Sequence, residues 1–411
     1  MDTAAATVPR VRAPGRIRRV TIVLPGAILL LLFAAVFAGS SLREGPNGAR
    51  MGADIAMFLG AAKVLHAGGN PYNHRLLYTV ESTWLARQHL PISGDPAIVR
   101  VGNPPLFFWA LQPLTRLPFR AAAWLWIGGT YLLAGVAFLA LLCGLGWSRV
   151  VIASVLFLLM PQVVLGVYPG NVDAVVFAGL VGSVVASARF PVMAGALGVA
   201  GWLKPQVALP ALALILIFHA ARPGRMLAAF AGATVLLTTL SLAAVGSSVM
   251  LDWMKSFITY SHDLHIQLGM PTLAGLYAPL PSWTARTVLS VTIFLAAGVL
   301  TVWWWRRDSP TRDLAGSAWL WVVWLLAAPY AHFHDEILLA IPLIAALGRN
   351  GRHITDGPAA IGWYLLLLSP IALLWMPDNV SLLGIPLVGV TVALFIQARR
   401  QQDGRAAESP A

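Results

Sequence analysis

The residues of this chain that could do chemistry are polar and ionisable side chains in five short tracts that lie far apart in the sequence. The tracts contain Asp54, Pro169–Asp173, Leu203–Gln206, Tyr260–His265 and Pro329–Glu336. Between them the chain is mostly apolar, and ionisable groups at membrane depth are costly and usually functional. If the five tracts meet at one face of the protein, they form the wall of a site.

Lys204 carries the most specific chemical suggestion. It separates two apolar segments, Pro205 after it frees backbone groups, and Gln206 adds a side-chain donor. A lysine in this setting reaches either the membrane interface or an anion. The tract is therefore either a snorkelling lysine or a clamp for an anion such as phosphate, and both interpretations stay open.

Asp54 lies in segment 52–66, whose apolar residues recur at helical spacing. We expect a short amphipathic helix at the outer membrane interface, with Asp54 in the first turn, where the helix dipole favours an ionised carboxylate. A charge that merely stabilises a helix N-terminus is the alternative. The composition of Gly68–Tyr72, which includes Asn70 and Tyr72, predicts a tight turn after this helix.

Histidines beside acids suggest metal ligands in His262–His265 and His332–Asp335. No third and fourth ligand follows either pair at a recognised spacing, and hydrogen-bonding histidines are commoner at interfaces. No glycine-rich phosphate loop is present, which argues against ATP or a nucleotide sugar. We therefore predict no metal and no cofactor.

Apolar runs must position these tracts. The chain is 58% hydrophobic and 11% charged, against roughly 25% charged in a soluble domain. A spanning helix needs ~20 mainly apolar residues. We predict an all-α, polytopic integral membrane protein with about twelve transmembrane helices, at 20–39, 121–143, 150–168, 172–188, 191–203, 205–219, 226–246, 284–304, 313–330, 335–348, 357–376 and 380–398.

The two short segments around Lys204, 191–203 and 205–219, are either separate segments or one long helix broken at Pro205. The single-helix alternative would reverse the side on which every later loop lies. Short cytoplasmic loops are enriched in Lys and Arg. With two segments and a cytoplasmic N-terminus, 17 of the 28 basic residues fall on the inside, so we favour that topology.

This topology gives a basic cytoplasmic N-terminus at 1–19, a single membrane domain at 20–398 and a cytoplasmic tail at 399–411. The long segment 40–120, with Asp54, then lies outside, and so do the other polar tracts. We expect a multi-pass cell-membrane protein with an extracytoplasmic site. The net charge of +12 indicates contact with anionic membrane lipids and requires no nucleic acid.

Taken in order, several motifs resemble glycosyltransferase family 87. They are Asp54 with Gly69–Tyr72, then Pro104–Leu106, Gly170–Asn171, Leu203–Gln206, and Pro329–Tyr330 with His332 and His334. The resemblance covers about residues 20–350. It implies the multi-spanning GT-C fold and transfer of mannose from a polyprenyl-phosphate sugar donor to a lipid-linked or glycan acceptor.

The resemblance also implies roles. Asp54 matches the family's catalytic base, and His334 matches a histidine that lines the site. A sugar on a lipid phosphate has a good leaving group, so one base suffices, whereas ordinary glycosidic hydrolysis uses two carboxylates. We expect an inverting displacement in which Lys204, Gln206 and His334 bind the donor phosphate. The residues expected to contact substrate are Asn70, Tyr72, Asn171, Asp173 and His332.

Two other classes of protein remain as alternatives. A secondary transporter also has broken helices and buried polar groups, but here the polar residues gather on the outer side and the two halves show no obvious repeat. A ligase of lipid-linked polymers, or a flippase-type envelope protein, would need outer arginines. The candidates for that role are Arg43, Arg50, Arg75, Arg87 and Arg100.

Overall fold

The computed structural model describes residues 52–89, 99–142, 160–167, 169–261, 272–307 and 313–350, together with 154, 157, 388–389, 391–392 and 394–396. The predicted N-terminus 1–19, the first span 20–39, the span 357–376, most of the span 380–398, the tail 399–411 and the histidines of the tract Tyr260–His265 lie outside the described residues. Every regular element in the described part is helical, as the predicted all-α class requires.

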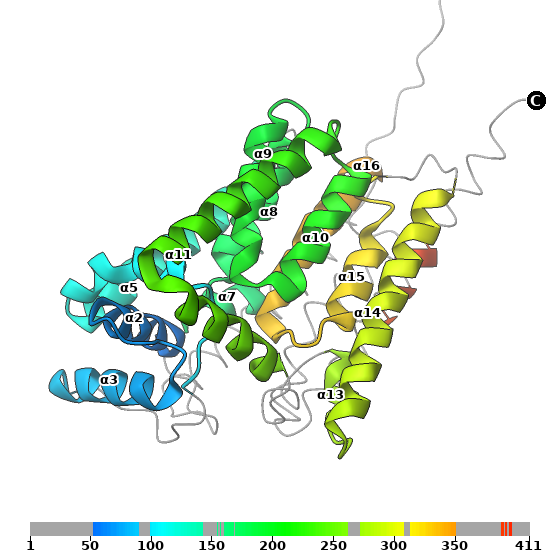
Figure 1. The fold of residues 1–411 in the computed structure, drawn as a ribbon. Helices are drawn as coiled ribbons and strands as arrows, with labels where there is room; N and C mark the ends of the chain where they lie inside the picture. The colour runs from blue at the N-terminus through cyan, green and yellow to red at the C-terminus, as the bar shows by residue number, and fades with distance from the viewer. Residues whose placement is uncertain are drawn as a thin grey trace, which may run out of the picture.

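The elements are arranged as an upright bundle with a smaller layer of helices across one end (Figure 1). In chain order they are α2 Ala53–His66, α3 His74–Arg87, α4 Pro105–Leu111, η1 Gln112–Arg116, α5 Phe119–Leu141, α7 Pro161–Val167, α8 Asp173–Ala186, α9 Pro191–Gly198, η2 Val199–Leu203, α10 Pro205–Phe218, α11 Pro223–Ser261, α13 Leu273–Tyr277, α14 Trp283–Arg306, α15 Ala318–Ala327, η3 Phe333–Leu339 and α16 Ala340–Asn350.

Three of the described helices are long and apolar enough to cross a membrane: Phe119–Leu141, Pro223–Thr259 and Trp283–Arg306. Four shorter apolar helices accompany them, at Asp173–Ala186, Pro191–Leu203, Pro205–Phe218 and Ala318–Ala327. The described residues thus support a membrane protein with several apolar helices. The predicted total of about twelve spans remains a prediction.

The chain reverses direction at Lys204, so the segments on either side of it are two helices and not one long broken helix. On the way to this turn the chain follows α11, since Gly195 packs against Met226 and the Trp202 indole donates to the Thr234 hydroxyl. On the way back α10 follows α8, and His219 contacts the carbonyl of Val184 at 3.1 Å. Lys204 itself has a non-helical backbone, with φ −143° and ψ 67°.

Two hydrophobic cores lie on either side of the polar tracts. The larger core fills the bundle and includes Phe177, Leu214 and Trp304. The smaller one holds together α2, α3, α4 and η1, which are called the α2 layer below, and it includes Leu59 and Phe108. Most of α2 is buried within the protein, so it is not the amphipathic helix that was expected, while its place at the membrane interface stays a prediction. The reason for its burial is that small residues let α3 approach, as where a Cβ on Gly60 would lie 3.2 Å from Glu81.

Helix α11 links the bundle to the α2 layer. Its 39 residues would extend for about 58 Å, nearly twice the hydrocarbon thickness of about 30 Å. The helix turns at Gly246, whose φ of 78° suits glycine. Beyond the turn Trp253 donates to the carbonyl of Gly102 and Ser256 to that of Val101. The distal part of α11 therefore lies across the α2 layer.

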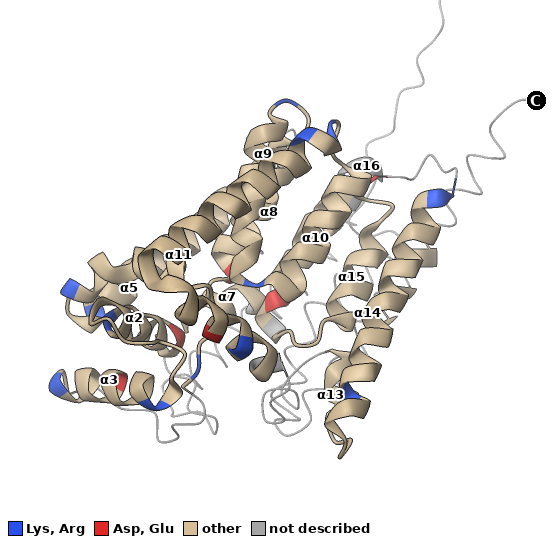
Figure 2. Ribbon diagram, viewed as in Figure 1, with Lys and Arg blue, Asp and Glu red and all other residues tan. Residues whose placement is uncertain are grey.

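Charged residues are unevenly placed in the described structure. Figure 2 shows Lys and Arg at the upper ends of α11 and α14 and also on α2, α3 and α5, whereas several acidic residues lie near the middle of the molecule. The elements that carry carboxylates towards the centre are α2, α8 and η3. The candidate site is built where these three elements meet.

Candidate active site

The loop before α8 holds the first turn of α2 in place. The carbonyl of Pro169 accepts from the backbone N–H groups of Asp54 at 2.8 Å and Ile55 at 3.1 Å. These are N–H groups that a helix N-terminus leaves without intrahelical partners. Gly170 has a φ of 83°, and a Cβ there would lie 2.8 Å from the Cβ of Ile55. Only glycine allows this approach, which the Trp126 indole reinforces by donating to the Gly170 carbonyl at 2.8 Å.

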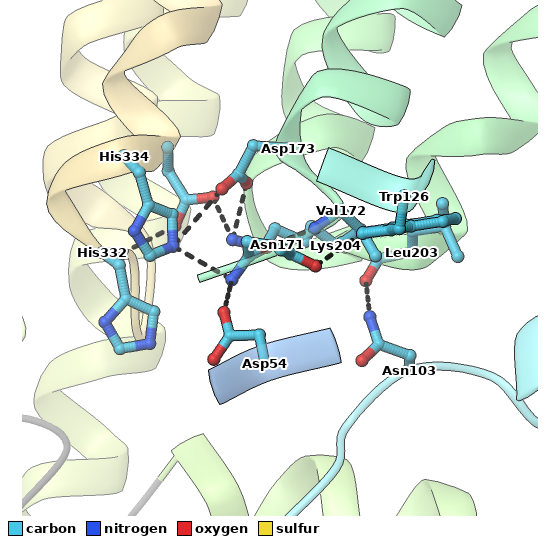
Figure 3. A network of polar contacts seen from close by, with 12 residues as sticks. Asp54, Asn103, Trp126, Asn171, Val172, Asp173, Leu203, Lys204, His332 and His334 are labelled. Carbon is cyan, nitrogen blue, oxygen red and sulfur yellow. Dashed lines mark hydrogen bonds and ion pairs between the residues drawn. The ribbon is translucent and has the colours of Figure 1, made fainter. Parts of the chain in front are cut away.

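The carboxylate of Asp54 meets Asn171 of the same loop. Asn171 Nδ2 donates to Asp54 Oδ2 at 2.7 Å (Figure 3). Although Asp54 keeps some exposed surface, burial raises the pKa of its carboxyl from 3.8 to about 6, against the lowering effects of the Asn171 bond and of Lys204. Nearby Asp173 raises it further. A carboxylate with this pKa is ionised near neutral pH and basic enough for proton abstraction.

Lys204 lies between two buried carboxylates. Its Nζ is 2.6 Å from Asp173 Oδ1 and 2.8 Å from Asp335 Oδ1. Burial alone would lower the pKa of Lys204, but the two carboxylates raise it above its usual value, so the ammonium stays charged. Asp335 also accepts from the backbone N–H of His332 through Oδ2 at 2.7 Å. The ammonium of Lys204 is therefore already paired with two carboxylates. The sequence-based expectation of a phosphate-binding lysine did not include these partners.

Two histidines complete the cluster. The rings of His332 and His334 stack, with centroids 5.2 Å apart and planes 28° apart. Burial, together with the charge of Lys204, lowers the pKa of His332 to about 4 and that of His334 well below 6.5, so both rings are neutral at physiological pH. His334 Nε2 lies 3.3 Å from Asn171 Nδ2 and 3.3 Å from Asp173 Oδ2.

Two neighbours of His334 Nε2 make opposite demands on its proton. Asn171 Oδ1 accepts from the N–H of Val172 at 2.6 Å, which fixes Nδ2 as the atom that faces Asp54 and His334. Asn171 Nδ2 can only donate and pairs with an Nε2 that has no proton, whereas the carboxylate oxygen Asp173 Oδ2 can only accept and pairs with an Nε2 that carries one. Neutral His334 has a single ring N–H in either case.

Asp173, His334 and Asp335 form a group within the described residues that could hold a metal ion, with ligand atoms within 4.8 Å of one another. Lys204 already supplies a positive charge to both carboxylates of this group. A cation would have to displace or oppose the ammonium. The expectation that the protein uses no metal therefore stays a prediction, and these contacts agree with it.

The predicted turn residues are not part of this cluster. Asn70 accepts from the backbone N–H of Tyr72, as in a tight turn, and donates from Nδ2 to Asp252 of α11 at 2.7 Å. The Tyr72 hydroxyl donates to the carbonyl of Asn103 at 2.7 Å. Asn103 in turn donates to the carbonyl of Leu203, next to Lys204, at 3.0 Å. Asn70 and Tyr72 thus support the wall of the site through hydrogen bonds to other elements.

Gln206 follows Lys204 closely in the sequence, and the structure buries it there, 5% exposed; among the described residues its Oε1 has no hydrogen-bond partner. Sequence reasoning missed the roles of Asp335, Asn103 and Trp126. The sequence had suggested Asp335 only as a metal ligand beside the histidines, and not as a partner of Lys204. Asn103 and Trp126 act through backbone carbonyls, which no spacing in the sequence reveals.

Comparison with known proteins identifies the family of this chain. A model of glycosyltransferase family 87 matches residues 102–329, more than half of the chain. The matched range contains Asn171, Asp173 and Lys204, whereas Asp54 and the tract His332–Asp335 lie outside it. No curated protein and no solved structure matched the chain.

Proposed function

Because the chain belongs to glycosyltransferase family 87, we propose that it transfers a hexose, specifically mannose, from a polyprenyl-phosphate sugar to a lipid-linked or glycan acceptor. In this proposal the reaction takes place at the extracytoplasmic face of the cell membrane. The family indicates a membrane glycosyltransferase. The donor, the sugar, the stereochemistry and the side of the membrane are the parts that we add.

The proposed reaction is a single displacement. Asp54 removes the proton of an acceptor hydroxyl while that oxygen attacks the anomeric carbon. The bond between the anomeric carbon and the phosphate oxygen breaks, and its electrons leave with the polyprenyl phosphate. Attack from the face opposite the leaving group inverts the anomeric configuration. A phosphate ester leaves without prior protonation, so no second carboxylic acid is required.

The observation that carries the proposal is the state of Asp54. Burial raises the pKa of its carboxyl to about 6, and Asn171 holds Oδ2 at 2.7 Å. Strongly perturbed carboxyls beside specific partners are common at catalytic sites. A charge that merely capped a helix would gain nothing from this burial, so the geometry favours the base over the structural alternative.

The donor phosphate is proposed to meet Lys204, Gln206 and His334. An ammonium has three N–H donors, and Asp173 and Asp335 use two of those on Lys204. The third N–H, with the ring N–H of neutral His334, would stabilise charge on the departing phosphate. Asp173 then positions the ammonium, and His332 contacts the substrate from the ring stacked on His334.

The extracytoplasmic placement rests on the charge pattern. Arg189 and Arg222 follow the C-terminal ends of α8 and α10, whose N-terminal ends carry Asp173 and Lys204 of the site. Arg306–Arg307 lie at the C-terminal end of α14. Short loops rich in arginine face the cytoplasm. The α2 layer and Asp54 would accordingly lie outside.

Accessibility to a membrane-impermeant thiol reagent tests this placement. In a Cys143→Ala background, Thr79→Cys on exposed α3 and Gly224→Cys at the start of α11 offer two exposed positions. In intact cells Thr79→Cys should react and Gly224→Cys should react only after lysis. The reverse pattern would overturn the extracytoplasmic placement.

The donor proposal is tested with purified protein, radiolabelled synthetic polyprenyl-phosphate mannose and octyl α-mannoside as the acceptor. We expect labelled disaccharide from the lipid donor and none from GDP-mannose. Anomeric analysis of the product should show a configuration opposite to that of the donor. Equal use of GDP-mannose, or retention of configuration, would refute the proposed donor or mechanism.

The alternatives receive less support than this proposal. A secondary transporter moves its substrate without transferring it, whereas membership of the family indicates a transferase. A ligase of lipid-linked polymers would rely on outer arginines, yet Arg75 and Arg87 are exposed on α3, away from the cluster around Asp54.

A further inference from the structure

Asn171 was expected to bind substrate, but both ends of its side-chain amide are engaged within the protein. Oδ1 accepts from the N–H of Val172 at 2.6 Å, and Nδ2 reaches Asp54 at 2.7 Å and His334 at 3.3 Å. Asn171 is itself buried, with 9% exposure. An amide nitrogen has two hydrogens; the bond to Asp54 uses one, and the other faces His334 Nε2. The side chain thus holds protein groups at both ends of its amide.

We infer that Asn171 is a positioning residue that orients the Asp54 carboxylate and couples it to His334. The inference rests on the proposed function, in which Asp54 is the base. The bond from Nδ2 occupies Oδ2 of Asp54, so Oδ1 is the oxygen that remains for the acceptor hydroxyl. Asn171 thereby selects which carboxylate oxygen takes the proton.

Asn171 also favours the ionised form of Asp54. Its bond lowers the pKa of Asp54 against the raising effect of burial, because a donor stabilises a carboxylate more than a carboxylic acid. The other ionisable groups of this face are Lys204, which lowers that pKa, and Asp173, which raises it, together with His332, His334 and Asp335 behind them. Among the described residues, Asn171 is the hydrogen-bond donor to the Asp54 side chain.

Two substitutions separate positioning from mere support of the fold. Asn171→Ala removes the donor. Asn171→Asp keeps the shape and the acceptor for the Val172 N–H, but puts a second carboxylate beside Asp54. Both should raise the pKa of Asp54, the second by more, since neighbouring carboxylates oppose each other's ionisation. Asn103→Ala is the matched control, since it removes a buried amide that bonds Leu203 and does not touch Asp54.

The test is the pH dependence of kcat/KM for transfer from polyprenyl-phosphate mannose to octyl α-mannoside. For Asn171→Ala the acid limb should move up by about one pH unit, the scale of one hydrogen bond to a charged group. Relative to the wild type, activity would then fall about fivefold more at pH 6 than at pH 9. Asn171→Asp should shift the limb further, Asn103→Ala should leave its midpoint in place, and the KM for the donor should change little.

If both Asn171 variants keep the wild-type acid limb while Asp54→Asn abolishes transfer, the positioning role is refuted and the proposed function stands. If Asp54→Asn retains transfer with an unchanged limb, the base assignment fails and the positioning role fails with it. Should Asn171→Ala not fold, the isosteric Asn171→Asp alone decides, since its limb either moves upward or does not.

Discussion

Two hydrogen bonds between an asparagine and an aspartate join the α2 layer to other helices, and the α2 layer supplies the acceptor in one and the donor in the other. In one, Asn171 of the bundle donates to Asp54 of α2; in the other, Asn70 of the turn after α2 donates to Asp252 of α11. Both bonds are 2.7 Å long. The chemical groups and the distance are the same, so any difference in role must come from the surroundings.

The surroundings differ in access to water and in neighbouring charge. The Asp252 side chain is 38% exposed and lies 3.5 Å from Lys255, which is 77% exposed. Its carboxylate is therefore in contact with water and with an exposed ammonium group. Asp54 lies against Lys204 and Asp173, and burial raises its pKa to about 6. The same type of bond is thus a solvent-accessible contact between two elements at Asp252, called the surface bond below, and part of a candidate active site at Asp54, called the buried bond.

The largest effect should follow from removing the positive charge of Lys204, which lies near the Asn171–Asp54 bond. Lys204→Gln leaves Asp173 and Asp335 buried without their cation, and breaking a buried ion pair from one side costs about 3–5 kcal/mol. The thermal unfolding midpoint in detergent should fall sharply, and transfer should be lost with it.

A double variant then separates charge balance from phosphate binding. Lys204→Gln with Asp335→Asn removes one charge of each sign, so the midpoint should recover most of the loss. Transfer should stay low if the third N–H of Lys204 meets the donor phosphate. Recovery of transfer together with stability would show that Lys204 acts only on the carboxylates.

The next largest effect is a loss of activity at low pH, and it should depend on Asp54 and not on Asp252. Transfer by the wild type should lose activity about tenfold per pH unit below a midpoint near pH 6, where Asp54 takes up a proton. Asp252→Asn should leave this limb unchanged. An acid limb whose midpoint shifts in Asp252→Asn, or a wild-type profile that stays flat down to pH 5, would contradict the assignment of this limb to Asp54.

The raised pKa of Asp54 also predicts a change in stability with a definite sign. The folded carboxyl binds its proton up to about pH 6, whereas the ordinary value is 3.8. The folded state is therefore destabilised relative to the unfolded chain as pH rises from about 4 to about 6. Asp54→Asn cannot ionise and escapes this loss, so it should unfold at a higher temperature than the wild type at pH 7 and lose the advantage at pH 4.

The smallest effect should come from removing the surface bond between Asn70 and Asp252. Asn70→Ala removes the donor to Asp252 in a solvated setting, where such bonds contribute about 1 kcal/mol or less. We expect a small decrease in the unfolding midpoint and nearly normal transfer. A loss of transfer as large as that of an Asp54 variant would show that the turn at Asn70 is part of the chemistry.

The contrast between the two bonds marks what the sequence could reveal. Helical spacing with Asp54 in the first turn predicted α2 correctly, and the polar tracts around Asp173, Lys204 and His334 do meet Asp54. Apolar runs predicted α5, α11 and α14 because period and length are local properties. The doubt about one helix or two at Lys204 ended only when contacts with α8 and α11 became visible.

What the sequence could not reveal depends on contacts between distant residues. Nothing in the spacing shows that Lys204 bonds Asp173 and Asp335, because opposite charges in different loops pair in many ways. The burial of α2 was missed since its small residues, such as Gly60, read as a weak apolar face until α3 is packed on them. Asn70 and Asn171 look alike in sequence, and only burial separates their roles.

The most direct test of the account compares the two aspartates in one assay. Purified Asp54→Asn and Asp252→Asn are given the same polyprenyl-phosphate mannose and octyl α-mannoside, with folding checked by thermal unfolding. Loss of a general base costs ~10²–10⁴-fold, so transfer by Asp54→Asn should fall by at least that range, while Asp252→Asn should lose less than about fivefold. Equal losses in the two variants, or nearly normal transfer by folded Asp54→Asn, would contradict the assignment of Asp54 as the base.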